Sequence, residues 1–228
     1  MANLRAGLIG LGMMGRHHAR VLSSLPGVDL VAVADAHGDV HGVANGRPLV
    51  ASIEELIAVG LDYCMVALPT GLHEEVGLAL AAAGVHALIE KPLAPTSVAS
   101  ARLADAFSAA GLIGAVGHIE RFNPALQQAR KRLADGELGQ VYQVVTRRQS
   151  PFPSRIADVG VVMDLATHDI DLTAWVTGQP FESVAAHTAY KSGRTFEDLV
   201  AVTGRLKDGT VTSHLVNWLT PFKERITV

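Results

Sequence analysis

Short apolar runs alternate with helical stretches through the first half of the chain. The runs suit strands buried on both faces, and the stretches between them carry helix caps and stops such as Ser52 with Glu55. This alternation is typical of parallel βαβ units, whose right-handed crossovers place helices on both faces of one sheet. The predicted strands are residues 4–9, 29–34, 62–68, 85–89 and 112–117, and the predicted helices are 13–24, a short one after 52, 70–83 and 96–110.

The pattern changes after Gly117. Asn123-Pro124 predicts a helix start, and Asp208-Gly209 predicts a hairpin between two strands. Strands that follow one another directly favour an antiparallel sheet with helices on one face. We therefore predict a doubly wound α/β domain over residues 1–120 and an α+β domain over 121–228. Its predicted helices are 123–136 and 164–176, and its predicted strands are 141–147, 184–190, 199–206 and 210–219.

Composition narrows the class of protein. Hydrophobic residues make up 49% of the chain, enough for a core, and the net charge of −3 argues against a strongly basic nucleic-acid binder. The single cysteine, Cys64, excludes an internal disulfide framework or a multi-cysteine zinc site and fits a reducing compartment. No apolar stretch has the length of a membrane span. Arg5 with apolar residues 6–15 imitates a signal peptide but lacks its cleavage pattern, so we expect a cytoplasmic protein.

A glycine-rich turn, Gly10-Leu11-Gly12-Met13-Met14-Gly15, follows the first predicted strand and opens a helix. In a βαβ unit such glycines permit a tight turn, close approach of a pyrophosphate and close helix–strand packing. Asp35 lies 20 residues after Gly15, where a carboxylate would bind adenosine ribose hydroxyls. It would repel a 2′-phosphate, and no Arg follows it, so the pattern favours NAD over NADP.

Polar residues follow two further strands at the edge where a doubly wound sheet binds ligands. Glu90-Lys91-Pro92 comes directly after residues 85–89, so Lys91 is expected to point into the cofactor cleft, although a lone lysine there is more often simply solvated. Pro69, Thr70 and His73 follow residues 62–68 and either line the same cleft or cap the next helix.

Asp164 and His168 are four residues apart in a predicted helix and therefore share one face. A carboxylate can orient an imidazole for general base catalysis. The alternatives are a metal site, for which no third ligand has convincing spacing, and an ordinary polar helix face. His118 and Arg121, where the second domain begins, either meet substrate or, for Arg121, form an ion pair between the domains.

These motifs, in this order, resemble the glucose–fructose oxidoreductase / inositol dehydrogenase / MocA family (Gfo/Idh/MocA) over essentially the whole chain. The resemblance implies an NAD(P)-dependent oxidoreductase with an N-terminal Rossmann domain, acting on a sugar or cyclitol hydroxyl. It implies that Lys91 contacts the reacting oxygen and the nicotinamide ribose, that His168 is the acid/base group and that Asp164 assists. It also implies homo-oligomers that form through the C-terminal sheet.

Two departures from the family pattern refine this expectation. Ile119 stands where many members carry Asn, and together with Pro153-Ser154-Arg155 and Trp218-Leu219-Thr220-Pro221 it resembles the UDP-N-acetylglucosamine 3-dehydrogenase branch. Arg155 joins His118 and Arg121 as a candidate substrate contact. The chain also stops at Val228 inside a predicted strand, where family members continue, so we expect the second domain to be truncated.

Two other classes compete with the enzyme. A noncatalytic NAD(H)-binding regulator could use the same fold, but it would not need Lys91, Asp164 and His168 together. A Rossmann-like methyltransferase has a similar glycine turn, but Glu90-Lys91-Pro92 and the antiparallel second domain argue against it. The sequence predicts no metal, nucleic-acid or membrane partner.

Overall fold

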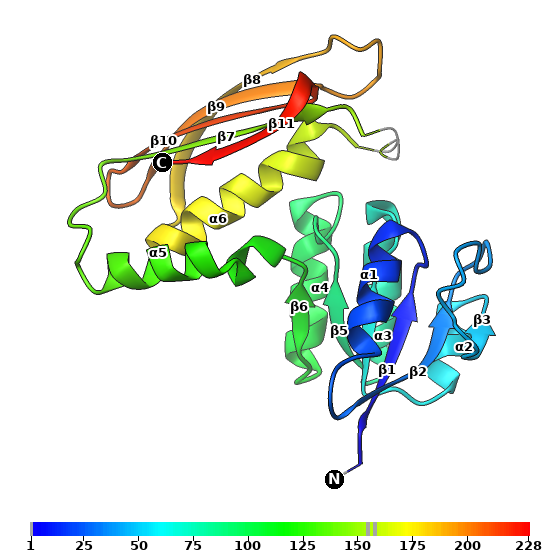
Figure 1. The fold of residues 1–228 in the computed structure, drawn as a ribbon. Helices are drawn as coiled ribbons and strands as arrows, with labels where there is room; N and C mark the ends of the chain where they lie inside the picture. The colour runs from blue at the N-terminus through cyan, green and yellow to red at the C-terminus, as the bar shows by residue number, and fades with distance from the viewer. Residues whose placement is uncertain (1, 154–155, 157–158) are drawn as a thin grey trace. The chain divides into compact units, whose positions relative to one another are not determined.

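The computed structural model describes residues 2–153, 156 and 159–228. The chain forms two compact units, Met1–Gly117 and His118–Val228. Figure 1 shows strands alternating with helices in the N-terminal unit and a sheet backed by helices in the C-terminal unit. Each unit is therefore described by itself.

The N-terminal unit is built on one parallel sheet. In its described residues the sheet has six strands in the order β3-β2-β1-β4-β5-β6, so the direction of strand succession reverses between β1 and β4. This is the predicted doubly wound arrangement. Its strands are β1 (Leu4–Ile9), β2 (Val28–Ala34), β3 (Leu49–Val50), β4 (Tyr63–Val66), β5 (His86–Ile89) and β6 (Gly114–Val116).

Local capping explains where the helices of this unit begin. The Ser52 hydroxyl accepts from the Glu55 N–H at 3.2 Å, and the Glu55 carboxylate accepts from the Ala51 N–H at 2.9 Å, in a capping-box arrangement. Thr96 caps the last helix by accepting from the Ala99 N–H. The helices are α1 (Met13–Leu22), α2 (Ile53–Ala58), α3 (His73–Ala82) and α4 (Ser97–Ala109), with a 3₁₀ turn η1 (Thr70–Leu72) before α3.

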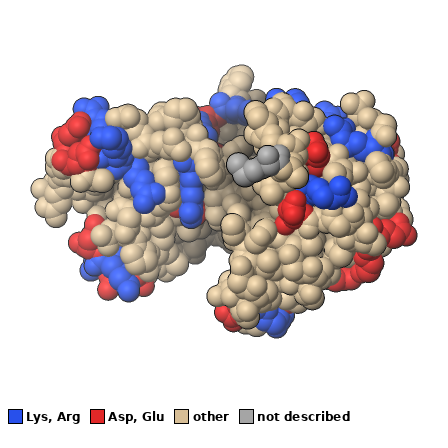
Figure 2. Space-filling model, turned by 90° about the horizontal axis from the view of Figure 1, so that it is seen from below, with Lys and Arg blue, Asp and Glu red and all other residues tan. Residues whose placement is uncertain are grey.

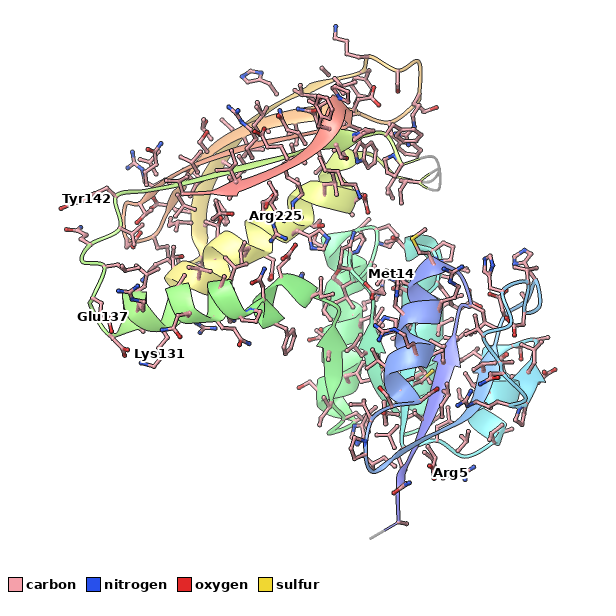
Figure 3. All side chains as sticks on the ribbon, viewed as in Figure 1. Arg5, Met14, Lys131, Glu137, Tyr142 and Arg225 are labelled. Carbon is pink, nitrogen blue, oxygen red and sulfur yellow. The ribbon has the colours of Figure 1, made fainter. Side chains whose placement is uncertain are left out.

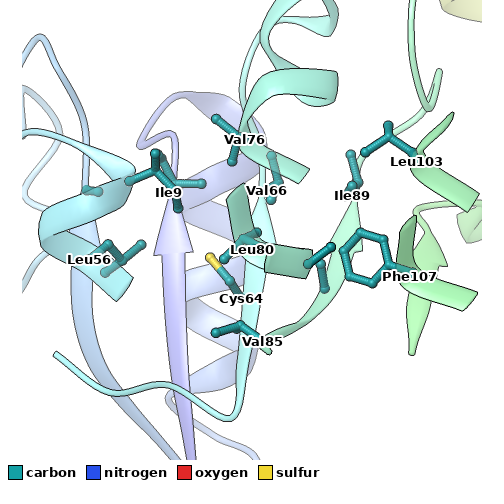
Figure 4. Close-up of a cluster of buried hydrophobic side chains, with 14 of the residues drawn as sticks. Ile9, Leu56, Cys64, Val66, Val76, Leu80, Val85, Ile89, Leu103 and Phe107 are labelled. Carbon is teal, nitrogen blue, oxygen red and sulfur yellow. The ribbon is translucent and has the colours of Figure 1, made fainter. Parts of the chain in front are cut away.

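The larger buried cluster of this unit lies between the sheet and the helices α2, α3 and α4, and a second buried cluster joins α1 to β1 and β2. Figure 4 shows Ile9, Val66 and Ile89 from three strands meeting Leu80 and Leu103 from two helices. Cys64 is completely buried in the same cluster, and this burial raises the pKa of its thiol to about 12. The thiol is therefore an inert core group.

The C-terminal unit is built on a mixed sheet in the order β11-β7-β10-β9-β8. All neighbouring pairs are antiparallel except β7 with β10, which run parallel. The mostly antiparallel prediction is confirmed. The elements are η2 (Ile119–Phe122), α5 (Pro124–Ala134), β7 (Gln143–Pro151), η3 (Val162–Ala166), α6 (Thr167–Thr177), β8 (Phe181–Ala189), β9 (Leu199–Leu206), β10 (Val211–Asn217) and β11 (Leu219–Thr227).

One face of this second sheet is packed and the other is open. Val200 and Val216 are paired in the ladder and buried against Val161 and Ala166, on the side where Figure 1 draws α6. Because side chains alternate along a strand, Leu215 points to the opposite face. No helix of the described residues covers that face in Figure 1.

Two predicted elements differ in the structure. The strand expected over residues 210–219 ends at Asn217, and β11 begins after the buried Trp218, so one expected strand is two. The helix expected from 164 starts as the π-helical turn η3 and becomes α-helical at Thr167. It ends at Gly178, whose φ of +69° is the left-handed conformation of a helix stop.

Charge is spread over the surface. On the face drawn in Figure 2, basic and acidic side chains are interspersed over both units, which agrees with the net charge of −3. In the part of the chain that the structure describes, no helix combines the length and apolarity needed to cross a membrane.

Candidate active site

The glycine turn joins β1 to α1, and close packing requires glycine at two of its three glycine positions. Gly10 has a φ of +92°, and a Cβ there would lie 2.5 Å from the Ala67 carbonyl oxygen, just after β4. A Cβ on Gly15 would lie 1.9 Å from the Gly10 carbonyl oxygen. Gly12 is different, because a Cβ there would meet nothing within 4 Å. The fold needs Gly10 and Gly15, whereas Gly12 keeps a space open.

The rest of the turn presents backbone to that space. Leu11 is buried in the core, while Met13 and Met14 are exposed at the start of α1, where Figure 3 labels Met14. The first N–H groups of a helix have no partner within the helix, and Gly12, as the cap, has no side chain to accept from them. They form a site for an anionic group.

Asp35 follows β2, and its carboxylate is hydrogen-bonded to the backbone of the glycine turn. Its Oδ2 accepts from the Leu11 N–H and its Oδ1 from the His37 N–H, both at 2.8 Å. Its side chain is 18% exposed, so part of the carboxylate remains accessible. Asp35 therefore has a structural role in addition to the ribose contact predicted for it.

Glu90 and Lys91 follow β5 at the same edge of the sheet. Glu90 Oε1 lies 2.8 Å from Nε2 of His18 on α1, and Glu90 Oε2 accepts from the Lys91 N–H at 3.2 Å. Gly117 leaves space for the Glu90 side chain, because a Cβ at position 117 would lie 2.9 Å from Glu90 Oε2. Both Glu90 oxygens are thus engaged in holding the segment, and sequence reasoning missed His18 and Gly117 as its supports.

Electrostatics fix the charge of Glu90. Burial raises the pKa of this carboxyl, but the hydrogen bond from His18 and the backbone N–H of Lys91 outweigh burial, and the pKa lies below its ordinary value. Glu90 is therefore a carboxylate that accepts from both neighbours.

Pro69, Thr70 and His73 follow β4. Pro69 is exposed and caps η1, and Thr70 is half-buried in that turn. His73 is 1% exposed, and its two ring nitrogens lie against the backbone carbonyls of Leu68 and Pro92. In this arrangement its ring nitrogens point to the protein's own backbone rather than to a cofactor.

In the C-terminal unit, Asp164 lies in the π-helical turn and His168 in the first turn of α6. Asp164 is 7% exposed and His168 is half-buried. Glu197 fixes the start of this segment, because its Oε1 accepts from the Val162 N–H at 3.0 Å and a Cβ on Gly160 would collide with its carboxylate. π-turns inside helices are frequent at functional sites.

Asp171 on α6 contacts two of the candidate substrate residues, Arg121 and His118. It accepts from Arg121 Nε at 2.9 Å and also from Arg121 Nη2, and His118 Nδ1 lies 3.5 Å from it. This hydrogen bond raises the pKa of the Arg121 guanidinium. The ion pair lies within the C-terminal unit. The third candidate, Arg155, lies outside the described residues.

A second ion network, which sequence reasoning missed, links α6 to the sheet. Arg148 on β7 donates to both oxygens of Asp169, at 3.1 and 3.0 Å, and to Glu120 at 3.2 Å. Arg225 on β11, labelled in Figure 3, also donates to Glu120. Spacing alone could not reveal it, because its members come from four separate segments. Among the described residues there is no cluster of three or more potential metal ligands.

The N-terminal unit fits a dinucleotide. The space at Gly12, the first N–H groups of α1, which the cap residue Gly12 does not bond through a side chain, and the Asp35 carboxylate all lie where β1 and β2 end. The reversal of strand order between β1 and β4 is the place where sheets of this kind bind ligands.

Comparisons with known proteins identify both units. Residues 4–118 match the oxidoreductase family with an NAD-binding Rossmann fold, and residues 126–228 match the GFO/IDH/MocA C-terminal domain. The chain belongs to the Gfo/Idh/MocA oxidoreductase family. Its N-terminal unit is the NAD-binding Rossmann domain of that family, as the glycine turn and Asp35 predicted.

Individual members of the Gfo/Idh/MocA family give the scale of the similarity. The chain is 33% identical over 215 residues to the UDP-N-acetylglucosamine 3-dehydrogenase of Acidithiobacillus ferrooxidans, covering 92% of this chain and 66% of that protein. It is 30% identical over 194 residues to the scyllo-inositol 2-dehydrogenase (NAD(+)) of Bacillus subtilis, covering 81% and 57%. The chain therefore spans about two thirds or less of these relatives.

A solved structure of the family agrees with the fold. The WlbA dehydrogenase from Bordetella pertussis, crystallised with NADH and UDP-GlcNAcA, superposes with a TM-score of 0.89 at 27% identity. The match covers 99% of this chain and 80% of that one. Both units thus have the family's architecture.

Proposed function

We propose that this protein is an NAD-dependent dehydrogenase that oxidises a CH–OH group of a sugar, cyclitol or nucleotide sugar. The observation that carries the proposal is the position of Lys91. It follows β5 at the carboxyl edge of the parallel sheet, and its neighbour Glu90 is anchored to α1, the helix that begins at the glycine turn. A solvated surface lysine would not need such an anchored neighbour.

Each polar residue has a role in this reaction. When bound, the nicotinamide supplies the hydride acceptor. The Lys91 ammonium stabilises the negative charge that develops on the substrate oxygen. His168 accepts the hydroxyl proton as general base, and Asp164 orients the imidazole. The Asp35 carboxylate accepts from the ribose hydroxyls of the adenosine.

Within this class we propose a nucleotide sugar as the substrate. The sequence variant around Ile119 and the 33% identity to a UDP-N-acetylglucosamine 3-dehydrogenase over 92% of the chain support this choice. Ile119 and Phe122 are 63% and 75% exposed, so the side chains that carry the variant are accessible. His118, Arg121 and Arg155 remain the proposed substrate contacts.

The test is reduction of NAD by the unmodified protein across UDP-N-acetylglucosamine, other UDP-sugars, inositols and free aldoses. We expect turnover with at least one compound and the highest kcat/KM with a UDP-sugar. The Lys91→Ala variant, assayed in parallel, identifies background reduction. Preference for an inositol would overturn the choice of substrate. Tight NAD binding without turnover on any compound would instead indicate a noncatalytic NAD(H)-binding protein.

A further inference from the structure

His73 joins the ends of two neighbouring strands from inside the N-terminal unit. Its Nε2 lies 2.9 Å from the carbonyl oxygen of Leu68, which follows β4. Its Nδ1 lies 3.0 Å from the carbonyl oxygen of Pro92, which follows β5. With the side chain 1% exposed, water cannot replace either contact. The imidazole thus bridges two backbone segments at the edge of the sheet that faces the cofactor.

The two acceptors restrict the form of the ring. A backbone carbonyl oxygen can only accept, so each ring nitrogen must carry hydrogen to make its bond. A neutral imidazole has one N–H and would face the other carbonyl with a lone pair. At least one of the two contacts is therefore a hydrogen bond that the ring donates to a backbone carbonyl, and the tautomer decides which.

Lys91 stands between two anchored residues. Glu90 before it is bonded to His18, and the carbonyl oxygen of Pro92 after it lies against the His73 ring. We propose that His73, buried between the carbonyl oxygens of Leu68 and Pro92, is a positioning residue that fixes the backbone of Lys91 at the sheet edge. The bridge itself is independent of the proposed dehydrogenase function, and only its effect on turnover rests on that function.

The bridge is tested directly by NMR of the histidine rings in the full chain. We expect a ring N–H of His73 that exchanges slowly with solvent, because it is buried and bonded to a carbonyl, with the signal assigned by its loss in His73→Gln. The exposed His37 gives the reference for a ring N–H that exchanges rapidly in the same spectrum. A His73 ring without a slowly exchanging N–H would overturn the proposal, and this result does not depend on finding a substrate.

The effect on Lys91 is tested by His73→Phe, which keeps an aromatic ring but removes both polar contacts with the backbone carbonyls. Small displacements of a catalytic group cost up to roughly 100-fold, so we expect kcat to fall about 10- to 100-fold while NAD affinity changes less than about threefold. The control is His86→Phe, because His86 on β5 accepts from the Ile113 N–H at 2.9 Å at the other end of the strand. It should lose stability but keep kcat.

Equal kcat in His73→Phe and the unmodified protein would show that the bridge does not position Lys91. If His73→Phe does not fold, His73→Gln takes its place, since the Gln amide can donate to one carbonyl and should retain an intermediate kcat. Complete absence of turnover in the unmodified protein would contradict the proposed function, whereas the ring-nitrogen measurement would still decide the bridge.

Discussion

Nε2 of His18 lies 2.8 Å from Oε1 of Glu90, which connects the helix that follows the glycine turn to the residue before Lys91. The segment that would bind the pyrophosphate and the segment that carries the proposed catalytic lysine are therefore parts of one rigid edge. A change in either is expected to affect the other, and the predictions below are designed to separate binding from folding and from chemistry.

The glycine turn offers a matched pair of variants. Gly15→Ala would place a methyl 1.9 Å from the Gly10 carbonyl oxygen, so we expect it to lower the thermal stability strongly or prevent folding. Gly12→Ala meets no atom within 4 Å and should leave the melting temperature nearly unchanged. It should weaken NAD binding by about tenfold or more, which corresponds to about 1.4 kcal/mol. Calorimetric titration and thermal unfolding of both variants check this. Unchanged NAD affinity in Gly12→Ala would contradict the predicted binding surface.

Asp35 should make NAD bind more tightly than NADP, because its carboxylate repels a 2′-phosphate. Asp35→Ala would narrow the difference, but it would also remove the acceptor that braces the Leu11 N–H. Asp35→Asn keeps an acceptor at that position and removes the charge, so it should narrow the difference by about tenfold with less loss of stability. Titration of each protein with both cofactors tests this, and equal or tighter NADP binding by the unmodified protein would contradict it.

Lys91→Ala and His168→Ala should each lower turnover by about 10²–10⁴-fold, the usual contribution of such groups, while NAD affinity changes less. Asp164→Asn should do milder damage, because it disturbs the orientation of the base without removing it. Lys207→Ala, at an exposed position next to the β9–β10 hairpin, is the control for loss of a lysine charge. Turnover, NAD affinity and thermal unfolding are measured together. Near-normal turnover in His168→Ala would shift the assignment of the base to His118.

Glu120 should make the C-terminal unit sensitive to acid. Burial raises the pKa of Glu120, but Arg225 and Arg148 outweigh it, so the pKa lies below the ordinary 4.5. A lowered pKa stabilises the fold above the ordinary value, and this stabilisation is lost as the pH falls through the folded-state pKa. Glu120→Gln should therefore cost about 2 kcal/mol near neutral pH, and the cost should shrink below about pH 4.5.

This cost can be measured by urea unfolding followed through tryptophan fluorescence, because Trp175 and Trp218 both lie in the C-terminal unit. The control is Glu137→Gln. Glu137 pairs with Arg132 at 2.7 Å but is 49% exposed, so its removal should cost well under about 1 kcal/mol. The same loss of stability for Glu120→Gln at neutral and acidic pH would contradict the proposed role of its charge.

The open face of the C-terminal sheet should mediate self-association. Leu215 lies in the middle of that face, beside Ala201 on β9 and Arg147 on β7. Leu215→Glu should dissociate an oligomer formed there, whereas Tyr142→Glu, at an exposed position before β7, should not. Sedimentation velocity distinguishes the two variants. A clean, stable monomer of the unmodified protein would contradict the prediction.

The sequence predicted most of the N-terminal unit because its signals are local. Each of the apolar runs that end at Gly10, Asp35 and Glu90 predicts a strand, and the residue directly after it predicts a turn or a ligand-binding position. It missed β3, whose two residues are too few for a periodic pattern. It also missed the contact of His18 with Glu90 and that of His73 with Pro92, because each joins segments that are distant in sequence. In the C-terminal unit, the helix periodicity around Asp164 carried no sign of the π-turn, which Glu197 helps to fix from another segment.

The parallel pairing of β7 with β10 has a consequence for how the chain folds. Gln143 pairs with Val211, and the other neighbour of β7 is β11, so β7 has partners only among strands made later in the chain. Such long-range pairings are slow to form. During synthesis the sheet of the Rossmann unit can form while β7 is still unpaired. The three strands β8, β9 and β10 can then pair with one another before β7 joins them. Translation order therefore leaves both edges of β7 unpaired until β10 and β11 have been made, and an unpaired strand edge favours premature association.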